Sequence, residues 1–272
     1  MARIIKAGGA AVVTGAALGI GRAAARRLAA EGMSVVLVDI DRDRLVALAD
    51  ELAETHGEEH VLRVVADLAE PADVAGMVHA TLARFGAPTF LMNNAVTRAG
   101  RGWDAPLPEW RRAFETNFWG VVETCAAFRP VMEKAARPAA IVNVGSKQGI
   151  TNPPGHPIYN VAKSALKTYS EALAHELRGG EAPLSVHLLV PGWTTTGEAE
   201  HKPGAWLPEQ VVEMMVAAVE ANDFYIICPD DETTPEMDRK RILWGAGDIV
   251  ENRPPLSRWH PDWKEAAAKA CS

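Results

Sequence analysis

Near the start of the chain lies the segment Ala10-Ala11-Val12-Val13-Thr14-Gly15-Ala16-Ala17-Leu18-Gly19-Ile20-Gly21. The apolar, partly β-branched residues 10–14 predict a buried strand, and residues 22–30 predict a helix. A strand, a glycine turn and a helix form the context that a phosphate-binding loop requires, because glycines let the backbone approach a pyrophosphate and the helix N-terminus offers unpaired N–H groups. An ordinary glycine-rich turn between a strand and a helix would show the same pattern.

Strand and helix patterns alternate along the rest of the chain. Apolar runs predict further strands at 34–38, 61–66, 89–92, 139–144, 184–190 and 224–228, with helical segments at 42–56, 71–85, 108–134, 159–177 and 208–220. Seven strands alternating with six helices predict an α/β fold, a doubly wound parallel sheet with right-handed crossovers and helices on both faces. No repeat or linker divides this pattern, so we expect a single domain over 1–272, in which 230–272 is a C-terminal extension.

Composition narrows the functional classes. The 272 residues are 48% hydrophobic and 23% charged, as in an ordinary globular protein, and the formal net charge of −7 disfavours nucleic acid or an anionic membrane as a partner. The cysteines, Cys125, Cys228 and Cys271, are odd in number and match no metal-ligand spacing, so we expect no metal and a reducing, cytoplasmic location. We expect neither a signal peptide nor an apolar stretch of the roughly 20 residues that span a bilayer.

Tyr159 and Lys163 are candidates for catalysis. Their four-residue spacing places both side chains on one face of a helix, about one turn apart. A fixed positive charge beside a phenol, whose ordinary pKa is about 10, favours the phenolate and suits tyrosine to acid/base work near neutral pH. The same spacing also occurs on solvated helix faces, so the other motifs must decide between these interpretations.

Asp39 bears on the choice of cofactor. It follows the second predicted strand, eighteen residues after Gly21. A carboxylate at this distance can accept hydrogen bonds from an adenosine ribose and would repel a 2′-phosphate, which favours NAD over NADP. The alternative is that Asp39 or Asp41 serves as the N-cap of the next helix.

Further polar residues stand at strand ends or inside a helix. Asn93-Asn94-Ala95 follows the fourth predicted strand, where the amides are expected to fasten neighbouring loops. Asn117 lies inside the helical segment 108–134, where asparagine is a mediocre residue because its amide competes for backbone groups; a satisfied buried amide would explain it equally well. Ser146 follows the fifth predicted strand, at the edge where open α/β sheets bind ligands.

Together these motifs resemble the short-chain dehydrogenase/reductase (SDR) family. The matching residues, in the family's order, are Thr14-Gly15-x-x-x-Gly19-x-Gly21, Asp67, Asn93-Asn94-Ala95, Asn117, Ser146, Tyr159-x-x-x-Lys163 and Pro191-Gly192. The resemblance covers roughly residues 8–229. It departs from the common pattern at Val96, where the family often has glycine, and at Gly145, where a second serine is frequent.

The resemblance implies a single NAD(P)-binding, Rossmann-like domain. The residues that it assigns to the dinucleotide are Gly15, Gly19, Ile20, Gly21, Asp39, Asp67, Leu68, Asn94, Ala95, Tyr159, Lys163, Pro191, Gly192, Thr194 and Thr196. The glycines would surround the pyrophosphate, Asp39 would hold the adenosine ribose and Asp67 would lie by the adenine. Asn94 would support the nicotinamide-side ribose region, and Thr194 and Thr196 would approach the carboxamide.

For catalysis the resemblance implies Asn117, Ser146, Tyr159 and Lys163. Tyr159 would remove the hydroxyl proton during alcohol oxidation and return it during ketone reduction, while Ser146 would hydrogen-bond the substrate oxygen. Lys163 would bind the nicotinamide ribose and lower the pKa of Tyr159, and Asn117 would help to anchor a water of a proton relay. We therefore expect an NAD-dependent enzyme that interconverts a secondary alcohol and a ketone. By resemblance it would be a homotetramer or dimer that meets through 108–134 and 159–177.

Substrate choice is expected to depend on residues that lie near the implied cleft in sequence. These residues are Gln148, Asn152, His156, Trp193 and Trp206. The two tryptophans favour an apolar or ring-shaped substrate, although hydrophobic packing of a lid would also explain them.

The extension 230–272 carries Trp244, Trp259 and Trp263, whose rings need burial. Two short helices are expected, at 234–245 and 261–270, because prolines exclude one long helix. The extension would dock as an arm on its own domain or on a neighbouring subunit, or cover the cleft as a lid.

Two other functions fit the motifs less well. An NADP-preferring carbonyl reductase would have the same fold, but Asp39 argues against its cofactor. A dinucleotide-sensing protein without turnover would not need both Tyr159 and Lys163, and both are present.

Overall fold

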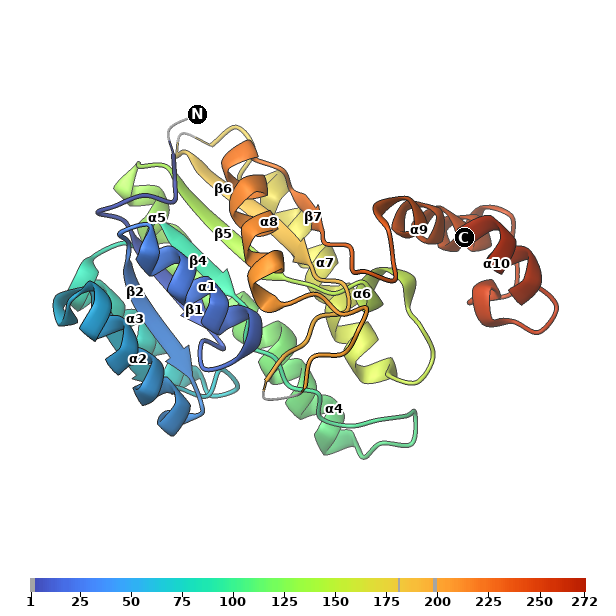
Figure 1. The fold of residues 1–272 in the computed structure, drawn as a ribbon, viewed down its shortest axis with the longest axis horizontal. Coiled ribbons are helices and arrows are strands. Elements are labelled where there is room, and N and C mark those ends of the chain that lie inside the picture. The colour runs from blue at the N-terminus through green and yellow to red at the C-terminus, as the bar shows by residue number, and fades with distance from the viewer. Residues whose placement is uncertain (1–2, 181, 198–199) are drawn as a thin grey trace.

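The computed structural model describes residues 3–180, 182–197 and 200–272, whose arrangement is drawn in Figure 1. A sheet of seven parallel strands forms its centre, in the order β3-β2-β1-β4-β5-β6-β7. The strands are β1 (Ala10–Thr14), β2 (Ser34–Asp39), β3 (Val61–Val65), β4 (Phe90–Asn93), β5 (Ala139–Val144), β6 (Leu184–Val190) and β7 (Tyr225–Ile227). The chain builds outward from β1 to β3 and then returns to the other side of β1, so the direction of winding reverses between β1 and β4.

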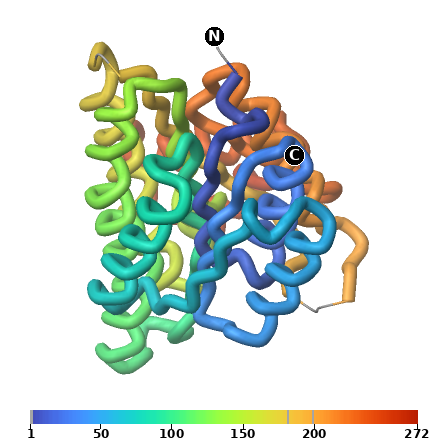
Figure 2. Tube along the Cα trace, turned by 90° about the vertical axis from the view of Figure 1, so that its left-hand side faces the viewer, coloured from blue at the N-terminus to red at the C-terminus, as the bar shows by residue number. Residues whose placement is uncertain are grey.

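Helices cover both faces of the sheet, as the side view in Figure 2 shows. One face packs against α1 (Gly19–Ala30), α2 (Arg42–His56) and α8 (Pro208–Ala221). The other packs against α3 (Pro71–Phe85), α5 (Gly120–Ala135) and α7 (Pro157–Glu176). The remaining helical segments are 3₁₀ turns at Glu58–His60 and Ser257–Trp259, α4 (Leu107–Phe114), α6 (Gln148–Thr151), α9 (Pro235–Val250) and α10 (Lys264–Cys271). The predicted doubly wound α/β fold is therefore confirmed.

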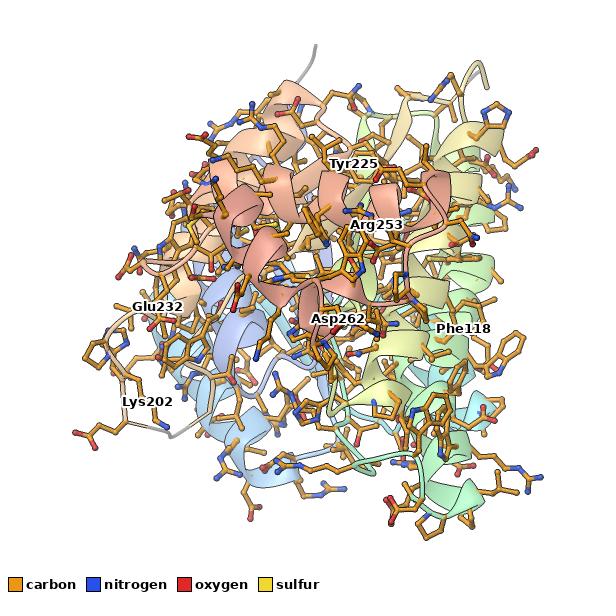
Figure 3. All side chains as sticks on the ribbon, turned by 90° about the vertical axis from the view of Figure 1, so that its right-hand side faces the viewer. Phe118, Lys202, Tyr225, Glu232, Arg253 and Asp262 are labelled. Carbon is orange, nitrogen blue, oxygen red and sulfur yellow. The ribbon has the colours of Figure 1, made fainter. Side chains whose placement is uncertain are left out.

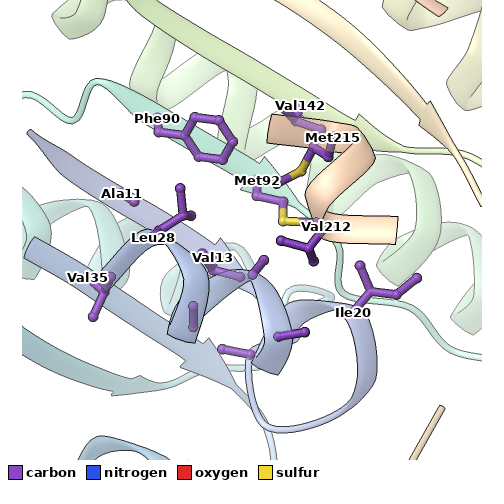
Figure 4. Packing of buried hydrophobic residues seen from close by; sticks show 14 of the residues in the cluster. Ala11, Val13, Ile20, Leu28, Val35, Phe90, Met92, Val142, Val212 and Met215 are labelled. Atoms are coloured by element: carbon purple, nitrogen blue, oxygen red, sulfur yellow. The ribbon is translucent and has the colours of Figure 1, made fainter. Parts of the chain in front are cut away.

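The central strands are buried on both faces, which explains why they are continuous apolar runs rather than alternating ones. In β1, Ala11 and Val13 pack into the cluster beneath α1 and α8, whereas Val12 packs into the cluster on the opposite face. Figure 4 shows the first cluster, with Val13 of β1 and Phe90 of β4 close to α1 and α8.

Element boundaries agree with the sequence pattern to within a few residues. Helix α7 begins at Pro157 rather than at Tyr159, because proline is favoured in the first helical turn, where its missing N–H would be unpaired anyway. Helix α1 begins at Gly19, inside the glycine segment, rather than at Arg22. Strand β7 is limited to Tyr225–Ile227, two residues shorter than 224–228.

The helical segment predicted at 108–134 is divided by a π-helical segment, Glu115–Trp119, that joins α4 to α5. Asn117 lies inside this segment, and its buried amide makes hydrogen bonds elsewhere in the chain. Single π turns inside α-helices are frequent at functional sites. The four-residue α6 was not expected, because it is too short to show a helical period.

Buried polar side chains connect the middle of the sheet to the helices above it. The Asn93 amide donates to the side-chain oxygen of Asn143 at 2.8 Å, and the Asn143 amide donates to the Ser170 hydroxyl at 3.0 Å. The Thr124 hydroxyl donates to the Asn93 oxygen at 2.7 Å. All four side chains are buried, so these hydrogen bonds fix β4, β5, α5 and α7 relative to one another.

The C-terminal extension has a small core of its own and projects to one side of the sheet in Figure 1. The Arg253 guanidinium, labelled in Figure 3, lies 4.2 Å from the ring centre of Trp244 and 5.6 Å from that of Trp263. Asp248 pairs with Arg253 at 3.2 Å, and the Trp244 indole N–H donates to Ser257 at 2.7 Å. Two of the three tail tryptophans are therefore packed around an arginine within the extension, whose α9 also contacts α6.

Two features are absent from residues 3–180, 182–197 and 200–272. No helix there combines the length and apolar character needed to cross a membrane. No group of three or more His, Cys, Asp or Glu side chains there is arranged to hold a metal ion.

We predict that Thr124→Val will destabilise the protein by about 1–3 kcal/mol. The buried side-chain oxygen of Asn93 would lose the Thr124 hydroxyl as its hydrogen-bond donor. Thr55→Val is the matched control: the Thr55 hydroxyl also donates to a backbone carbonyl, but on an exposed helix surface, and a change within about 0.5 kcal/mol is expected. Urea unfolding followed by circular dichroism measures both. Equal effects at the two positions would show that the buried network adds no stability.

Candidate active site

Because all seven strands are parallel, their carboxyl ends meet at one edge of the sheet, and the candidate residues gather there. The residues at or just beyond these ends are Gly15, Asp39, Asp67, Asn94, Ala95, Ser146, Pro191 and Gly192. The reversal of winding between β1 and β4 makes the loops on the two sides diverge, which is where open α/β sheets form a binding crevice.

The glycine loop between β1 and α1 has no room for side chains. Gly15 and Gly19 have φ of +65° and +54°, and a Cβ added at Gly21 would lie 2.0 Å from the Gly15 carbonyl oxygen. The Asn94 amide donates to the carbonyls of Thr14 and Gly15, each at 3.0 Å. The expectation that Asn94 fastens neighbouring loops is met: it holds the loop against the end of β4.

Asp39 is the last residue of β2, and its carboxylate turns toward the glycine loop. It accepts hydrogen bonds from the backbone N–H of Ala17 at 2.9 Å and of Asp41 at 3.0 Å. The N-cap of α2 is Asp41, whose side chain accepts from the N–H of Arg44. The alternative role of helix cap therefore belongs to Asp41, and Asp39 remains available to a ligand through its other lone pairs.

A cavity of about 200 Å³ lies at this edge between β1, β2, β3 and β4. Its lining residues include Gly15, Asp39, Asp67, Leu68, Ala95, Arg112 and Thr116. Burial opposes ionisation of Asp67, but the N–H of Ala69 and the Arg112 guanidinium outweigh it, so the pKa of Asp67 lies below its ordinary value. The Thr116 hydroxyl is buried and has no hydrogen-bond partner in the described chain.

These features fit a dinucleotide. The glycine loop leaves backbone N–H groups and the start of α1 open to a pyrophosphate, and the cavity combines apolar walls with carboxylates and an unpaired hydroxyl for an adenosine. Five of the residues assigned to the cofactor by resemblance line this one cavity: Gly15, Asp39, Asp67, Leu68 and Ala95.

Tyr159 and Lys163 lie in the first two turns of α7. The Lys163 side chain is 3% exposed, and its Nζ donates to the carbonyl of Val144, at the end of β5, at 2.7 Å. The same Nζ lies 5.9 Å from the centre of the Tyr159 ring. Gly149 of α6 allows this close packing, since a Cβ there would lie 2.6 Å from the Lys163 carbonyl carbon.

Ser146 follows β5 and faces the same phenol. Burial raises the pKa of Tyr159 above its ordinary value, while a hydrogen bond with Ser146 and the charge of Arg98 oppose the rise. Burial, with a smaller contribution from Arg98, lowers the pKa of Lys163 to about 7. The positive charge that acts on the phenol here is thus that of Arg98. The expectation that Lys163 lowers the pKa of Tyr159 stays a prediction.

Arg98 is a residue of this site that the sequence did not reveal. Its guanidinium carbon lies 5.5 Å from the centre of the Tyr159 ring, and its side chain is exposed. It lies in the segment between β4 and α4, and nothing in the pattern of residues 94–104 distinguishes it from Arg101. Arg98 comes close to Tyr159 only because that segment folds over the start of α7.

Asn117 is fully buried, and its side chain is occupied. Its oxygen accepts from the N–H of Thr97 at 2.8 Å and its amide donates to the carbonyl of Thr97 at 2.9 Å. This is the satisfied buried amide that the sequence allowed as an alternative. The part of Asn117 in a proton relay stays a prediction.

The loop after β6 lies against the glycine loop. A Cβ at Gly192 would lie 2.6 Å from the Asp230 carboxylate, and the Thr194 hydroxyl donates to the Gly192 carbonyl at 3.1 Å. A Cβ added at Gly19 would lie 3.2 Å from the Thr196 side chain. Thr196 is therefore beside the proposed pyrophosphate loop.

The five residues expected to contact substrate have different surroundings. Gln148 has a buried side-chain oxygen without a partner, and Asn152 accepts a hydrogen bond from Asn160 at 2.9 Å. His156 is partly buried directly before α7, and Trp193 is 43% exposed at the sheet edge. The Trp206 ring packs against the core cluster, and its N–H donates to Asp231 at 3.1 Å. Trp206 thus has the packing role that the sequence left open.

Lys147, the residue after Ser146, connects this edge to the C-terminal extension. Its Nζ lies 3.3 Å from the carboxylate of Asp230 and 2.7 Å from that of Asp238, which belongs to α9. Asp230 also accepts from the N–H of Trp193 at 3.0 Å. The three side chains are largely buried, so the extension is attached next to the candidate catalytic serine.

Comparisons with known proteins agree with this geometry. A family model described as short chain dehydrogenase matches residues 9–204. The 1-deoxy-11-beta-hydroxypentalenate dehydrogenase of Streptomyces avermitilis is 36% identical over 189 residues, which cover 68% of this chain and 68% of that protein. The chain spans 64% of the length of two other curated oxidoreductases that it matches.

Two solved structures are similar over most of their length. A short chain dehydrogenase/reductase from Burkholderia phymatum in complex with NAD superposes with a TM-score of 0.83 at 29% identity, covering 92% of this chain and 96% of that one. The L-sorbose reductase of Gluconobacter frateurii, complexed with NADPH and L-sorbose, superposes with a TM-score of 0.74 at 26% identity, covering 84% and 98%.

We predict that Gly15→Ala will weaken dinucleotide binding by about tenfold or more, because the added Cβ would lie 2.8 Å from both Ala95 Cα and the Asn94 amide nitrogen. Gly86→Ala is the matched control, since Gly86 also has a positive φ but an added Cβ meets nothing within 4 Å. Both substitutions carry the backbone strain of about 1–2 kcal/mol, and Gly15→Ala adds the clash with the Ala95 backbone, so it should also lower thermal stability more than Gly86→Ala does. Fluorescence titration with NADH separates the two; unchanged affinity in Gly15→Ala would exclude this loop from the binding site.

Proposed function

The chain belongs to the short-chain dehydrogenase family, and we propose that it transfers a hydride between NAD(H) and a secondary alcohol or ketone, with Tyr159 as the general acid and base. The observation that carries this proposal is the convergence of Ser146, Tyr159 and Lys163 at the sheet edge that also carries the glycine loop. Ser146 hydrogen-bonds the phenol, and Lys163 is held next to it by the Val144 carbonyl. Membership of this family follows from the comparisons, and the oxidoreductase activity, the residue roles and the substrate are our proposal.

The chain's own groups define where the cofactor would bind. The glycine loop would hold the pyrophosphate, Asp39 the adenosine ribose, and the loop after β6 the nicotinamide end. A bound nicotinamide supplies the hydride acceptor for oxidation and the donor for reduction. The protein contributes position and proton transfer.

Proton transfer is assigned to the phenol of Tyr159. In oxidation the phenolate oxygen accepts the substrate's hydroxyl proton, and in reduction the phenol donates a proton to the carbonyl oxygen. The Ser146 hydroxyl hydrogen-bonds the same substrate oxygen and holds it within reach. Because burial raises the pKa of Tyr159, the site needs positive charge near the phenol, which Arg98 supplies and Lys163 would add when protonated.

The preference for NAD rests on the charge of Asp39. Its carboxylate is held at the end of β2 by the N–H groups of Ala17 and Asp41, beside the cavity proposed for the adenosine. A 2′-phosphate approaching this position would meet a negative charge. An NADP-preferring reductase is therefore the weaker proposal, and a non-catalytic sensor would leave the intact Ser146, Tyr159 and Lys163 without a purpose.

We assign residues 230–272 to an arm that forms part of the single domain and is anchored beside the active site. The ion pairs of Lys147 with Asp230 and Asp238 support the anchoring, and the Arg253 cluster supports packing within the extension. The expectations of a homotetramer or dimer and of a cytoplasmic location remain predictions.

We predict that Tyr159→Phe will lower turnover by about 10²- to 10⁴-fold, because the phenyl ring fills the same space but cannot transfer a proton. NADH affinity should stay within about twofold. A tenfold change in affinity would need a loss of about 1.4 kcal/mol of binding free energy. Tyr225→Phe removes a hydroxyl from an exposed tyrosine on β7 and is the control. Turnover is followed by NADH absorbance over linear and cyclic secondary alcohols and ketones. Full activity of Tyr159→Phe would contradict the assignment of the acid/base group.

We further predict that Asp39→Asn will raise the ratio of kcat/KM for NADP over NAD by about tenfold or more, because the repulsion of the 2′-phosphate is removed. Asp41→Asn removes an equal charge two residues away, at the N-cap of α2, and asparagine caps helices equally well. Its cofactor ratio should not change. The same change of ratio in both variants would mean that general charge, rather than a contact from Asp39, sets the preference.

A further inference from the structure

Arg98 and Lys163 place two cationic groups around one phenol. The Arg98 guanidinium carbon lies 5.5 Å from the centre of the Tyr159 ring, and the Lys163 Nζ lies 5.9 Å from it. Lys163 is buried against the Val144 carbonyl, whereas Arg98 is exposed at the mouth of the site. A cation can lie favourably over an aromatic face, but an exposed pair of this kind is worth only about 0.5–1 kcal/mol.

Arg98 has no anionic partner within the described residues. Other arginines form ion pairs, as Arg26 does with Glu51, Arg27 with Glu213 and Arg112 with Asp67. No carboxylate of residues 3–180, 182–197 or 200–272 forms an ion pair with Arg98, and its charge acts on two groups, Tyr159 and Lys163, neither of which is anionic at rest. In a chain of net charge −7, the mouth of the site therefore carries an exposed positive charge beside Tyr159.

The charge of Arg98 opposes the rise of the Tyr159 pKa, and its guanidinium is also exposed at the mouth of the site, where it can meet a second partner. Binding a neutral alcohol or ketone needs the Ser146 hydroxyl and the Tyr159 phenol. A guanidinium at the mouth of the site can donate a hydrogen bond to a neutral alcohol or ketone, but it has no net Coulomb attraction for such a molecule. It would, however, attract a substrate with a negative charge, and a guanidinium matches the two oxygens of a carboxylate.

We propose that Arg98 binds a carboxylate on the substrate, so that the enzyme acts on hydroxy acids and oxo acids rather than on neutral alcohols and ketones. This inference rests on the proposed function, since it takes Tyr159 as the acid/base group. Arg98 pairs with the carboxylate and holds the carbon that bears the hydroxyl near Tyr159 and Ser146. A single guanidinium suits a carboxylate better than a phosphate dianion, which is usually bound by several donors.

A binding measurement tests the inference without turnover. Hexanoate and hexanamide have similar size and lack a hydroxyl, so neither can react, and calorimetric titration of the enzyme saturated with NADH measures their affinity. We expect hexanoate to bind about ten- to hundredfold more tightly than hexanamide, the range of a charge-assisted hydrogen bond, and Arg98→Met to remove that difference. Arg98→Lys should restore part of it. Arg101→Met, which removes another exposed arginine of the same segment, should leave it unchanged.

Kinetics give a second readout. With 2- and 3-hydroxyhexanoate and their methyl esters, the acid should be preferred, and Arg98→Met should abolish the preference mainly through KM of the acid. Equal affinities for hexanoate and hexanamide, or a difference that survives Arg98→Met, would overturn the inference. A third result would also overturn it: Arg98→Met lowers the turnover of acid and ester equally and displaces the pH profile upward. Arg98 would then act only on the pKa of Tyr159. The proposed function fails separately, if Tyr159→Phe retains turnover.

Discussion

The parallel pairing of β1 with both β2 and β4 is the constraint on which the rest of the structure depends. It makes the direction of winding reverse at β1, so that the carboxyl ends of the strands share one edge and the loops diverge above β1 and β4. The close contact of Gly21 with Gly15 and the hydrogen bonds of Asn94 hold the glycine loop at that edge. The cavity proposed for the adenosine and the proposed catalytic groups therefore lie at the same edge of the sheet.

Electrostatics at this crevice follow from burial. Lys163 is enclosed between α6, α7 and the end of β5, which lowers its pKa to about 7 and limits how much positive charge it can supply near neutral pH. Arg98 stays charged because guanidinium is not deprotonated in proteins. The exposed arginine is thus the more dependable source of charge beside Tyr159. Since no carboxylate among the described residues pairs with it, that charge is available to a ligand.

The C-terminal extension shows how a segment without family support acquires its structure. Its tryptophans need burial, and Arg253 provides a flat cation against which Trp244 and Trp263 pack. Its attachment depends on Asp238, which meets Lys147 in a largely buried ion pair. Removal of one partner from a buried ion pair strongly destabilises a protein. The extension and the segment after Ser146 are therefore coupled in position.

Much of the fold could be read from local patterns. Strands such as Ala139–Val144 and helices such as Pro71–Phe85 were predicted to the residue, because apolar runs, proline at a first turn and glycine after a last turn act over a few neighbouring residues. The glycine loop and the spacing of Tyr159 and Lys163 are likewise local, since a strand, a turn or one helical turn brings their atoms together.

Contacts between distant segments were decided only by the tertiary structure. The Asn117 amide in the π turn meets Thr97, twenty residues away, and Arg98 reaches Tyr159 only when the segment after β4 folds over α7. The ion pair of Lys147 with Asp238 and the network of Asn93 with Asn143 join residues separated by fifty positions or more. Side-chain pairing across such separations depends on how elements pack, and no local periodicity carries that information.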